Sequence, residues 1–289
     1  MRVLVFGTTG QVARELALSA DGIEMTALGR AGADLVNAMD CARAIRESGA
    51  QVVINAAAHT AVDRAEDEPE VAYAINAVAP GAMAVAAADI GAVFLHVSTD
   101  YVFDGAPGGA WTEADATGPL GVYGASKFEG EQAVAAAGGD HVILRTAWVF
   151  SAHGKNFVKT MLSVGAGREE MRVVGDQRGG PTAARDIAGA LWTIARAWTE
   201  GRGRSGIYHY AGAPAVSWAE FAEAIFARAG WDHAPKVTRI GAADYPTKAR
   251  RPENSVLDCR KIHEDYGIVQ PDWRPALDAV VAELAKESA

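Results

Sequence analysis

The chain has 289 residues, about twice the length of a typical domain, and a formal net charge of −9 at pH 7. Hydrophobic residues make up 49% of the chain and charged residues 22%, which argues against a disordered protein. The excess of acidic residues argues against nucleic acid or an anionic membrane as the main partner. Two cysteines cannot build a disulfide framework, and the first residues do not form a signal peptide. We therefore expect a cytoplasmic protein.

The first half of the chain alternates short apolar runs with alanine-rich stretches. The runs predict strands at residues 3–6, 24–27, 52–55, 92–98 and 141–146. The stretches between them predict helices at residues 11–19, 42–48, 69–89 and 123–137, with a break or kink at Pro80. The core of the third helix, residues 74–88, is shorter than the roughly 18 apolar residues of a membrane span. The alternation predicts an α/β fold with a doubly wound parallel (Rossmann) sheet and no membrane partner.

The second half of the chain is less regular. Further helices are predicted at residues 156–164, 183–198, 218–229 and 275–286, and Ser217 with Glu220 forms a capping box before the third of them. Glycine- and proline-rich joints separate these helices, notably residues 175–181 and 247–252. We expect an NAD(P)-binding Rossmann domain at 1–148 and a smaller, irregular substrate-binding domain at 149–289. Some segments of the second half, such as 183–198, are expected to return to the first domain.

A glycine turn follows the first strand and opens the first helix. Gly7 and Gly10 stand in the pattern Gly-x-x-Gly-x-x-Ala, where glycine allows a tight turn and a close approach of a pyrophosphate to helix N–H groups. A purely structural strand–helix turn is the alternative. The second strand ends at Arg30 without an acid that would bind a ribose 2′-hydroxyl, and arginine accommodates a 2′-phosphate. The pattern favours NADPH as the cofactor and leaves NADH open. The alternative is that Arg30 is a solvated surface residue with no role in binding.

Tyr123 and Lys127 lie four residues apart in a predicted helix, so their side chains share a face. An ammonium close to a phenol favours the phenolate, and we expect Lys127 to lower the pKa of Tyr123. The fourth predicted strand ends in Ser98 and Thr99, which places hydroxyl groups at the carboxyl edge of the sheet. Together these groups can protonate or deprotonate an oxygen on a carbon that exchanges hydride.

The motifs taken together resemble those of the extended short-chain dehydrogenases/reductases, and within them the dTDP-4-dehydrorhamnose reductase family. The resemblance covers nearly the whole chain and rests on the glycine turn, Tyr123-x-x-x-Lys127 and the segments 55–60, 98–103, 145–150, 156–161, 176–182 and 251–255. It implies NADPH-dependent reduction of the C4 ketone of dTDP-4-dehydro-6-deoxy-L-mannose to dTDP-L-rhamnose.

The resemblance also implies roles for single residues. Tyr123 would be the general acid, with Lys127 tuning it and binding the nicotinamide ribose, and with Thr99 adjusting the proton donor. In addition to Gly7 and Arg30, already assigned above, the resemblance implies as cofactor-binding residues Gly10, Gln11, Val12, Asp34, Leu35, Ala58, His59, Thr60 and Val97. The implied substrate-binding residues are Thr99, Asp100, Trp148 and Asn156. Arg178 and Arg251 are candidate substrate-binding residues that would contact the diphosphate, which needs cations or N–H donors, and surface salt bridges are their alternative role.

Two alternatives to this function stay open. In related dehydratases the corresponding segment looks like Thr-Asp-Glu, whereas this chain has Thr99-Asp100-Tyr101. Without the glutamate there is no carboxylate base to remove a proton from C5 of the sugar, which favours simple hydride transfer. A reductase or epimerase of another nucleotide 4-keto-sugar is one alternative, and a non-catalytic NADP-binding regulatory subunit is the other.

The acidic cluster at residues 63–70 is expected to be a solvated helix start, and no metal ligand is assigned in the chain. Some members of the family that this chain resembles bind Mg²⁺ at a dimer contact. A bound Mg²⁺ and a homodimer therefore remain open, and no residue is assigned as a Mg²⁺ ligand.

Overall fold

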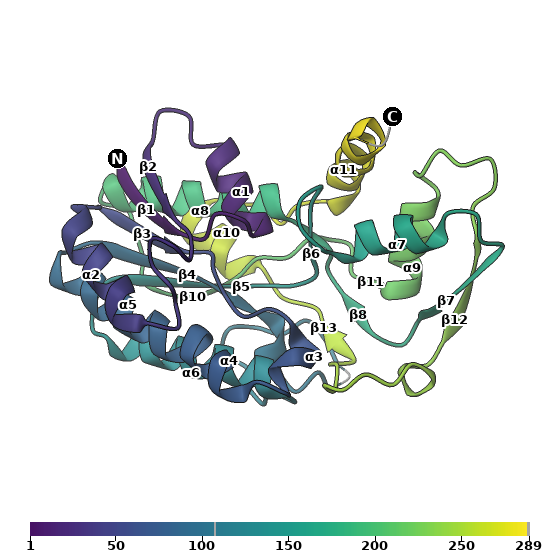
Figure 1. The fold of residues 1–289 in the computed structure, drawn as a ribbon, viewed down its shortest axis with the longest axis horizontal. Coiled ribbons are helices and arrows are strands. Elements are labelled where there is room, and N and C mark those ends of the chain that lie inside the picture. The colour runs from purple at the N-terminus through teal and green to yellow at the C-terminus, as the bar shows by residue number, and fades with distance from the viewer. Residues whose placement is uncertain (107, 288–289) are drawn as a thin grey trace.

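The computed structural model describes residues 1–106 and 108–287 and has two unequal lobes side by side (Figure 1). The larger lobe contains a parallel sheet of six strands, β10-β5-β4-β3-β1-β2 in spatial order. The strands are β1 (Arg2–Phe6), β2 (Glu24–Leu28), β3 (Val52–Asn55), β4 (Val93–Thr99), β5 (His141–Thr146) and β10 (Gly206–His209). The predicted parallel α/β sheet is confirmed. The sixth strand, β10, was not predicted.

Helices cover both faces of this sheet because successive side chains of a strand point to opposite faces. Val3 and Val5 of β1 pack with helices α1 (Gln11–Leu18) and α8 (Ala184–Thr199). Leu4 and Phe6 of the same strand pack toward the other layer. That layer contains α2 (Ala38–Ser48), α5 (Ala79–Asp89) and α6 (Val122–Ala136), as Figure 1 shows. The sheet is therefore doubly wound, with one apolar core on each face.

The long helical stretch at residues 69–89 is divided into three parts. Helix α4 (Pro69–Tyr73) leads through a π-helical turn at Ala74–Val78 into α5. Pro80 has no N–H to donate to the carbonyl of Asn76, which explains why the regular ladder is interrupted here. By length and composition alone, the whole helical stretch of 21 residues, longer than the apolar segment 74–88, could cross a membrane. Its buried side chains, among them Met83, belong instead to the core beneath the sheet.

The close crossing of α6 over the π-helical turn depends on Gly130. A Cβ atom added at Gly130 would lie 2.0 Å from the carbonyl oxygen of Asn76. We expect Gly130→Ala to lower the free energy of unfolding by about 1–3 kcal/mol, because the backbones of both helices must move apart. Gly189→Ala on α8 is the matched control, since no atom lies within 4 Å of its Cβ position. The control should be stabilising by about 0.5–1 kcal/mol. Urea denaturation compares the two, and equal effects would contradict the close crossing.

The smaller lobe has a core of its own. It contains α7 (Phe157–Gly165), α9 (Trp218–Phe226) and a two-stranded parallel sheet of β7 (Glu170–Val174) and β12 (Lys236–Ile240). Helix α11 (Trp273–Glu287) adds Trp273 and Leu277 to the same core. The predicted capping box of Ser217 and Glu220 is confirmed at the start of α9.

The remaining helices and strands are short. They are α3 (Val62–Ala65), α10 (Arg260–Tyr266), β6 (Val149–Phe150), β8 (Arg178–Gly179), β9 (Thr182–Ala183), β11 (Val216–Ser217) and β13 (Asn254–Ser255). Helix α8 packs on α1, and β10 pairs with β5, so both lie in the larger lobe although they follow the first small-lobe helix in the chain. We propose a domain division in which residues 1–148 are completed by 184–209 and 260–266, and in which the other segments after residue 148 form the second domain.

Candidate active site

A cavity of about 680 Å³ opens at the carboxyl ends of β1, β3, β4 and β5 and continues toward the smaller lobe. This is the edge at which open α/β sheets bind ligands. Most of the predicted site residues line it. They are Gly7, Gly10, Gln11, Val12, Arg30, Asp34, Leu35, Ala58, Thr60, Val97, Thr99, Asp100, Tyr123, Lys127 and Trp148.

The glycine turn forms one end of the cavity. Gly7 has φ +114°, a conformation open to glycine, and a Cβ there would lie 3.2 Å from the Cβ of Ala13. Gly10 is the N-cap of α1, and no side chain caps the free N–H groups of the first turn. Unpaired N–H groups and the positive end of the helix dipole suit a pyrophosphate. The turn therefore fits a dinucleotide.

Arg30 lies at the rim of the same end. Its side chain is 80% exposed, and its Nε is 3.7 Å from a carboxylate oxygen of Asp34. Gly29 before it packs against Thr8, since a Cβ at Gly29 would lie 2.7 Å from the Thr8 hydroxyl. The guanidinium of Arg30 is thus an exposed cation with one weak ion pair, and a side chain at position 29 would require Thr8 to shift.

Tyr123, Thr99 and Asp100 meet at the centre of the cavity. Thr99 donates a hydrogen bond to Oδ1 of Asp100 at 3.0 Å and accepts one from the Tyr101 N–H. Burial raises the pKa of Tyr123 to about 12, and the contact with the Thr99 hydroxyl opposes this shift. Burial also raises the pKa of Asp100 to about 6. The phenol is therefore neutral at physiological pH, which is the state of a proton donor.

Lys127 is fully buried one helical turn beyond Tyr123. Its Nζ donates to the carbonyl of Val97 at 2.7 Å and lies 3.1 Å from Nε2 of His96. Burial lowers the pKa of Lys127 to about 8. The expectation that Lys127 lowers the pKa of Tyr123 is not met in this structure, because burial of the phenol dominates and raises it.

Trp148 forms the wall toward the smaller lobe. It is the one non-glycine residue with positive φ, +49°, in the described ranges 1–106 and 108–287. Its ring stacks on Trp218 of α9, with centroids 3.4 Å apart, and a Cβ at Gly179 would lie 2.5 Å from the ring. A strained aromatic residue held from both sides is a rigid platform at the cavity.

Two predicted residues beside the cofactor end do not line the cavity. His59 turns toward Glu68, with Nε2 3.6 Å from the carboxylate. Asn156 caps α7 and donates to Oε1 of Gln11 at 2.9 Å. Asn156 therefore holds a cavity residue in place from behind.

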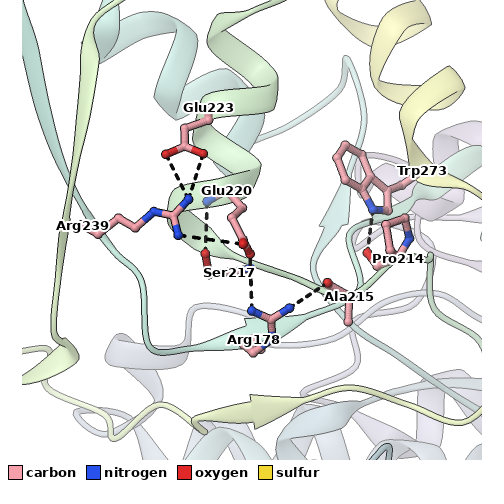
Figure 2. A network of polar contacts seen from close by, with 8 residues as sticks. All are labelled: Arg178, Pro214, Ala215, Ser217, Glu220, Glu223, Arg239 and Trp273. Carbon is pink, nitrogen blue, oxygen red and sulfur yellow. Dashed lines mark hydrogen bonds and ion pairs between the residues drawn. The ribbon is translucent and has the colours of Figure 1, made fainter.

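Two predicted phosphate contacts also lie outside the cavity wall. Arg178 is half-exposed and donates to the carbonyl of Ala215, with Glu220 beside it at 3.5 Å (Figure 2). Arg251 donates to Asp63 at 2.7 Å, and its charge acts on Tyr101, which does line the cavity. Arg178 is thus engaged within the smaller lobe, while Arg251 stands close behind the cavity.

The acidic cluster is not simply a solvated helix start. Asp63 accepts from Arg251 and from the Ala249 N–H, and Asp67 pairs with Lys248. Glu66 accepts from the N–H of Val122 at the start of α6. The cluster fastens the segment before β13 to the larger lobe. In the described part of the chain, no three His, Cys, Asp or Glu side chains gather in a way that could hold a metal ion.

Sequence reasoning missed several residues of the site. Thr8, Thr9, Ala56, Thr146 and Lys155 also line the cavity. His96 and Asn55 lie behind Lys127, and their polar types within two otherwise apolar buried strands were the available signal.

The chain matches the family model described as the RmlD substrate binding domain over residues 1–286. It is 45% identical to the dTDP-4-dehydrorhamnose reductase of Sinorhizobium fredii, with 99% of each chain covered. It is 39% identical to the enzyme of the same name from Escherichia coli K12, with 98% of each covered.

Solved structures agree with this match. The dTDP-4-dehydrorhamnose reductase of Clostridium acetobutylicum superposes with a TM-score of 0.91 at 36% identity, covering 99% of this chain and all of that one. The Bacillus anthracis enzyme in complex with NADP superposes with a TM-score of 0.90 at 32% identity, covering 98% and 99%. This chain belongs to the dTDP-4-dehydrorhamnose reductase family.

Proposed function

We propose that the protein reduces the C4 ketone of dTDP-4-dehydro-6-deoxy-L-mannose with NADPH and gives dTDP-L-rhamnose, the last step of dTDP-rhamnose synthesis. The observation that carries this proposal is the meeting of Tyr123, Thr99 and Lys127 in one cavity with the glycine turn. The relatives named for this activity match over the full length of the chain. We propose the cytoplasm as its location. Mg²⁺ is not part of the proposal, since residues 1–106 and 108–287 contain no cluster of side chains that could hold a metal ion.

A bound NADPH would supply the hydride to the ketone carbon. The neutral phenol of Tyr123 donates its proton to the oxygen of the former ketone as negative charge develops there. Thr99, which contacts the phenol, orients that proton. Lys127 would hold the nicotinamide ribose, and as an ammonium it stabilises the tyrosinate that remains after proton transfer.

The sugar occupies the part of the cavity between Asp100 and Trp148. Asp100 accepts hydrogen bonds from sugar hydroxyls, and the face of Trp148 packs against the deoxysugar ring. Arg251, close behind Tyr101, adds positive potential for the diphosphate, whose negative charge the acidic exterior would repel.

A coupled assay tests the proposed function. The protein is incubated with dTDP-glucose, the upstream dehydratase and 3,5-epimerase, and NADPH, and the loss of absorbance of NADPH is followed. The sugar product is then identified by mass spectrometry and NMR. We expect one NADPH oxidised per dTDP-L-rhamnose formed. Absence of NADPH oxidation, a different sugar, or retention of the cofactor through a full cycle would overturn the assignment.

The cofactor preference is tested at Arg30. We expect Arg30→Ser to raise the KM for NADPH about 10- to 100-fold, because a charge-assisted contact with the 2′-phosphate is lost. The KM for NADH should stay nearly unchanged. Arg43→Ser, which removes another exposed arginine of the same lobe, is the control and should affect neither cofactor. An equal change for both cofactors with Arg30→Ser would contradict a role in 2′-phosphate binding.

A further inference from the structure

Three buried polar side chains form a line that ends at the cofactor cavity. Asn55 and His96 are register partners on β3 and β4, and His96 reaches Lys127 on α6. The two strand residues are 0% exposed and Lys127 is 1% exposed, yet only Lys127 lines the cavity. Neither Asn55 nor His96 has a part in the proposed reaction, although burying polar groups in the sheet is costly without such a part or full hydrogen bonding.

The hydrogen bonds of Asn55 fix the direction of this line. Its Oδ1 accepts from the N–H of Ala57 at 3.1 Å, so its Nδ2 is the group that faces Nδ1 of His96 at 3.2 Å. Nδ2 can only donate, and Nδ1 of His96 must therefore accept. A neutral imidazole that accepts at Nδ1 carries its proton on Nε2.

Nε2 of His96 faces Nζ of Lys127 at 3.1 Å. With its proton on Nε2, the imidazole donates, and the lysine must accept through a lone pair. An ammonium has no lone pair, whereas a neutral amine accepts one hydrogen bond and still donates to the carbonyl of Val97 at 2.7 Å. All four hydrogen bonds of the line are satisfied together only when Lys127 is a neutral amine.

We propose that Asn55 and His96 stabilise the neutral amine form of Lys127 before the cofactor binds, and that NADPH binding at alkaline pH is coupled to the uptake of a proton from solvent by Lys127. This inference rests on the proposed function, because it requires Lys127 to meet the nicotinamide ribose. The ammonium gains ribose hydroxyls as acceptors and an anionic ligand nearby. In exchange, the proton of His96 moves from Nε2 to Nδ1 and the amide of Asn55 turns over, giving up its bond to Ala57. Asn55 and His96 are thus positioning residues for Lys127.

The charges around Lys127 are consistent with this resting state. Burial lowers the pKa of Lys127 to about 8, so the neutral amine predominates above that pH, and Glu131 on the same helix opposes the shift. Glu131 is itself paired with Arg145 of β5 at 2.6 Å, which weakens its hold on the lysine. Burial also lowers the pKa of His96 well below its ordinary value, so the imidazole stays neutral. The neighbouring phenol of Tyr123 is neutral, since its pKa is raised.

Calorimetric titration of the full-length protein with NADPH tests the coupling. Binding enthalpies are compared at pH 8.5 in phosphate and in Tris, whose ionisation enthalpies differ, so that their difference counts the protons taken up. We expect uptake of about 0.8 proton per NADPH at pH 8.5 and about 0.2 at pH 7.5, following the neutral fraction of a group with a pKa of about 8. The fragment 2′,5′-ADP is the control ligand, because it carries the 2′-phosphate but no nicotinamide ribose, and it should show no uptake at pH 8.5.

Asn55→Asp is the matched variant. A carboxylate accepts from both Ala57 and His96, which places the imidazole proton on Nδ1 and makes Nε2 an acceptor for a permanent ammonium. The variant should bind NADPH with no proton uptake. Binding of NADPH to the natural protein without uptake, or equal uptake by the variant, would overturn the inference. Neither outcome touches the proposed function, which fails instead if the coupled assay shows no reduction.

Nitrogen NMR of histidine-labelled protein gives a second readout should the variant not fold. The His96 signals are assigned by their loss in His96→Gln. In the natural protein at pH 8.5 they should show a protonated Nε2 and an unprotonated Nδ1. Addition of NADPH should reverse the two. A His96 protonated on Nδ1 in the free protein would overturn the inference.

Discussion

Tyr123→Phe lowers kcat about 100- to 1,000-fold, the effect expected when a positioned general acid is removed. The substitution deletes only the phenolic hydroxyl, so the ring keeps its edge-on contact with Tyr101, at 5.5 Å between centroids. NADPH affinity should stay within about threefold of the natural protein, because the glycine turn and Lys127 are untouched. Stopped-flow reduction with saturating sugar measures the rate, and fluorescence titration measures cofactor binding.

Tyr101→Phe is the control for this prediction. Tyr101 also lines the cavity, and burial raises the pKa of its phenol above the ordinary value, but it lies on the turn that follows β4. Its hydroxyl has no assigned proton to transfer, so the change in kcat should be less than about tenfold. Near-full activity of Tyr123→Phe, or an equal loss in both variants, would remove Tyr123 as the proton donor.

Glu131→Ala is expected to cost about 3–5 kcal/mol of unfolding free energy. Both partners of the pair are 2% exposed. Glu131 accepts three hydrogen bonds from Arg145 and one from Ser98, and Arg145 lies over the ring of Phe103. Without the carboxylate, the guanidinium stays buried and uncompensated. Urea denaturation followed by circular dichroism measures the loss.

Two controls separate burial from charge. The double variant Glu131→Leu with Arg145→Met removes both charges together and should recover most of the lost stability. Asp89→Ala breaks the exposed pair with Arg46, in which both side chains are more than two-fifths exposed, and should cost less than about 1 kcal/mol. A cost for Glu131→Ala as small as that of Asp89→Ala would show that the buried pair is dispensable.

The regular elements of the sheet could be predicted because their signals are local. Apolar runs such as Val52–Asn55 are buried on both faces and need only length and neighbours to be recognised. Strand β10 was missed because Gly206–His209 is short and polar at its ends, and only its pairing with β5 makes it a strand. The sequence analysis expected segment 183–198 to return to the first domain. It could not predict that this helix, α8, packs against α1.

The site shows the same division. Tyr123 and Lys127 could be paired from their spacing on one helix, and the glycine turn from its place between strand and helix. The family resemblance implied that His59 and Asn156 bind ligands, yet their side chains turn to Glu68 and Gln11. Sequence neighbourhood places a backbone near a site, whereas the direction of a side chain depends on partners far along the chain.

The sequence by itself determined the doubly wound sheet, the dinucleotide turn and the tyrosine–lysine pair, because each depends on the order of neighbouring residues. Only the tertiary structure decided the protonation of the site. Burial keeps the phenol of Tyr123 neutral. Lys127 contacts His96, 31 residues earlier in the chain, and His96 in turn contacts Asn55, 72 residues before Lys127. The net charge of −9 likewise says little about the cavity. Its electrostatic potential depends on the helix N–H groups and the few cations that line it. Charge states follow from burial and hydrogen bonding, and these exist only once the chain is folded.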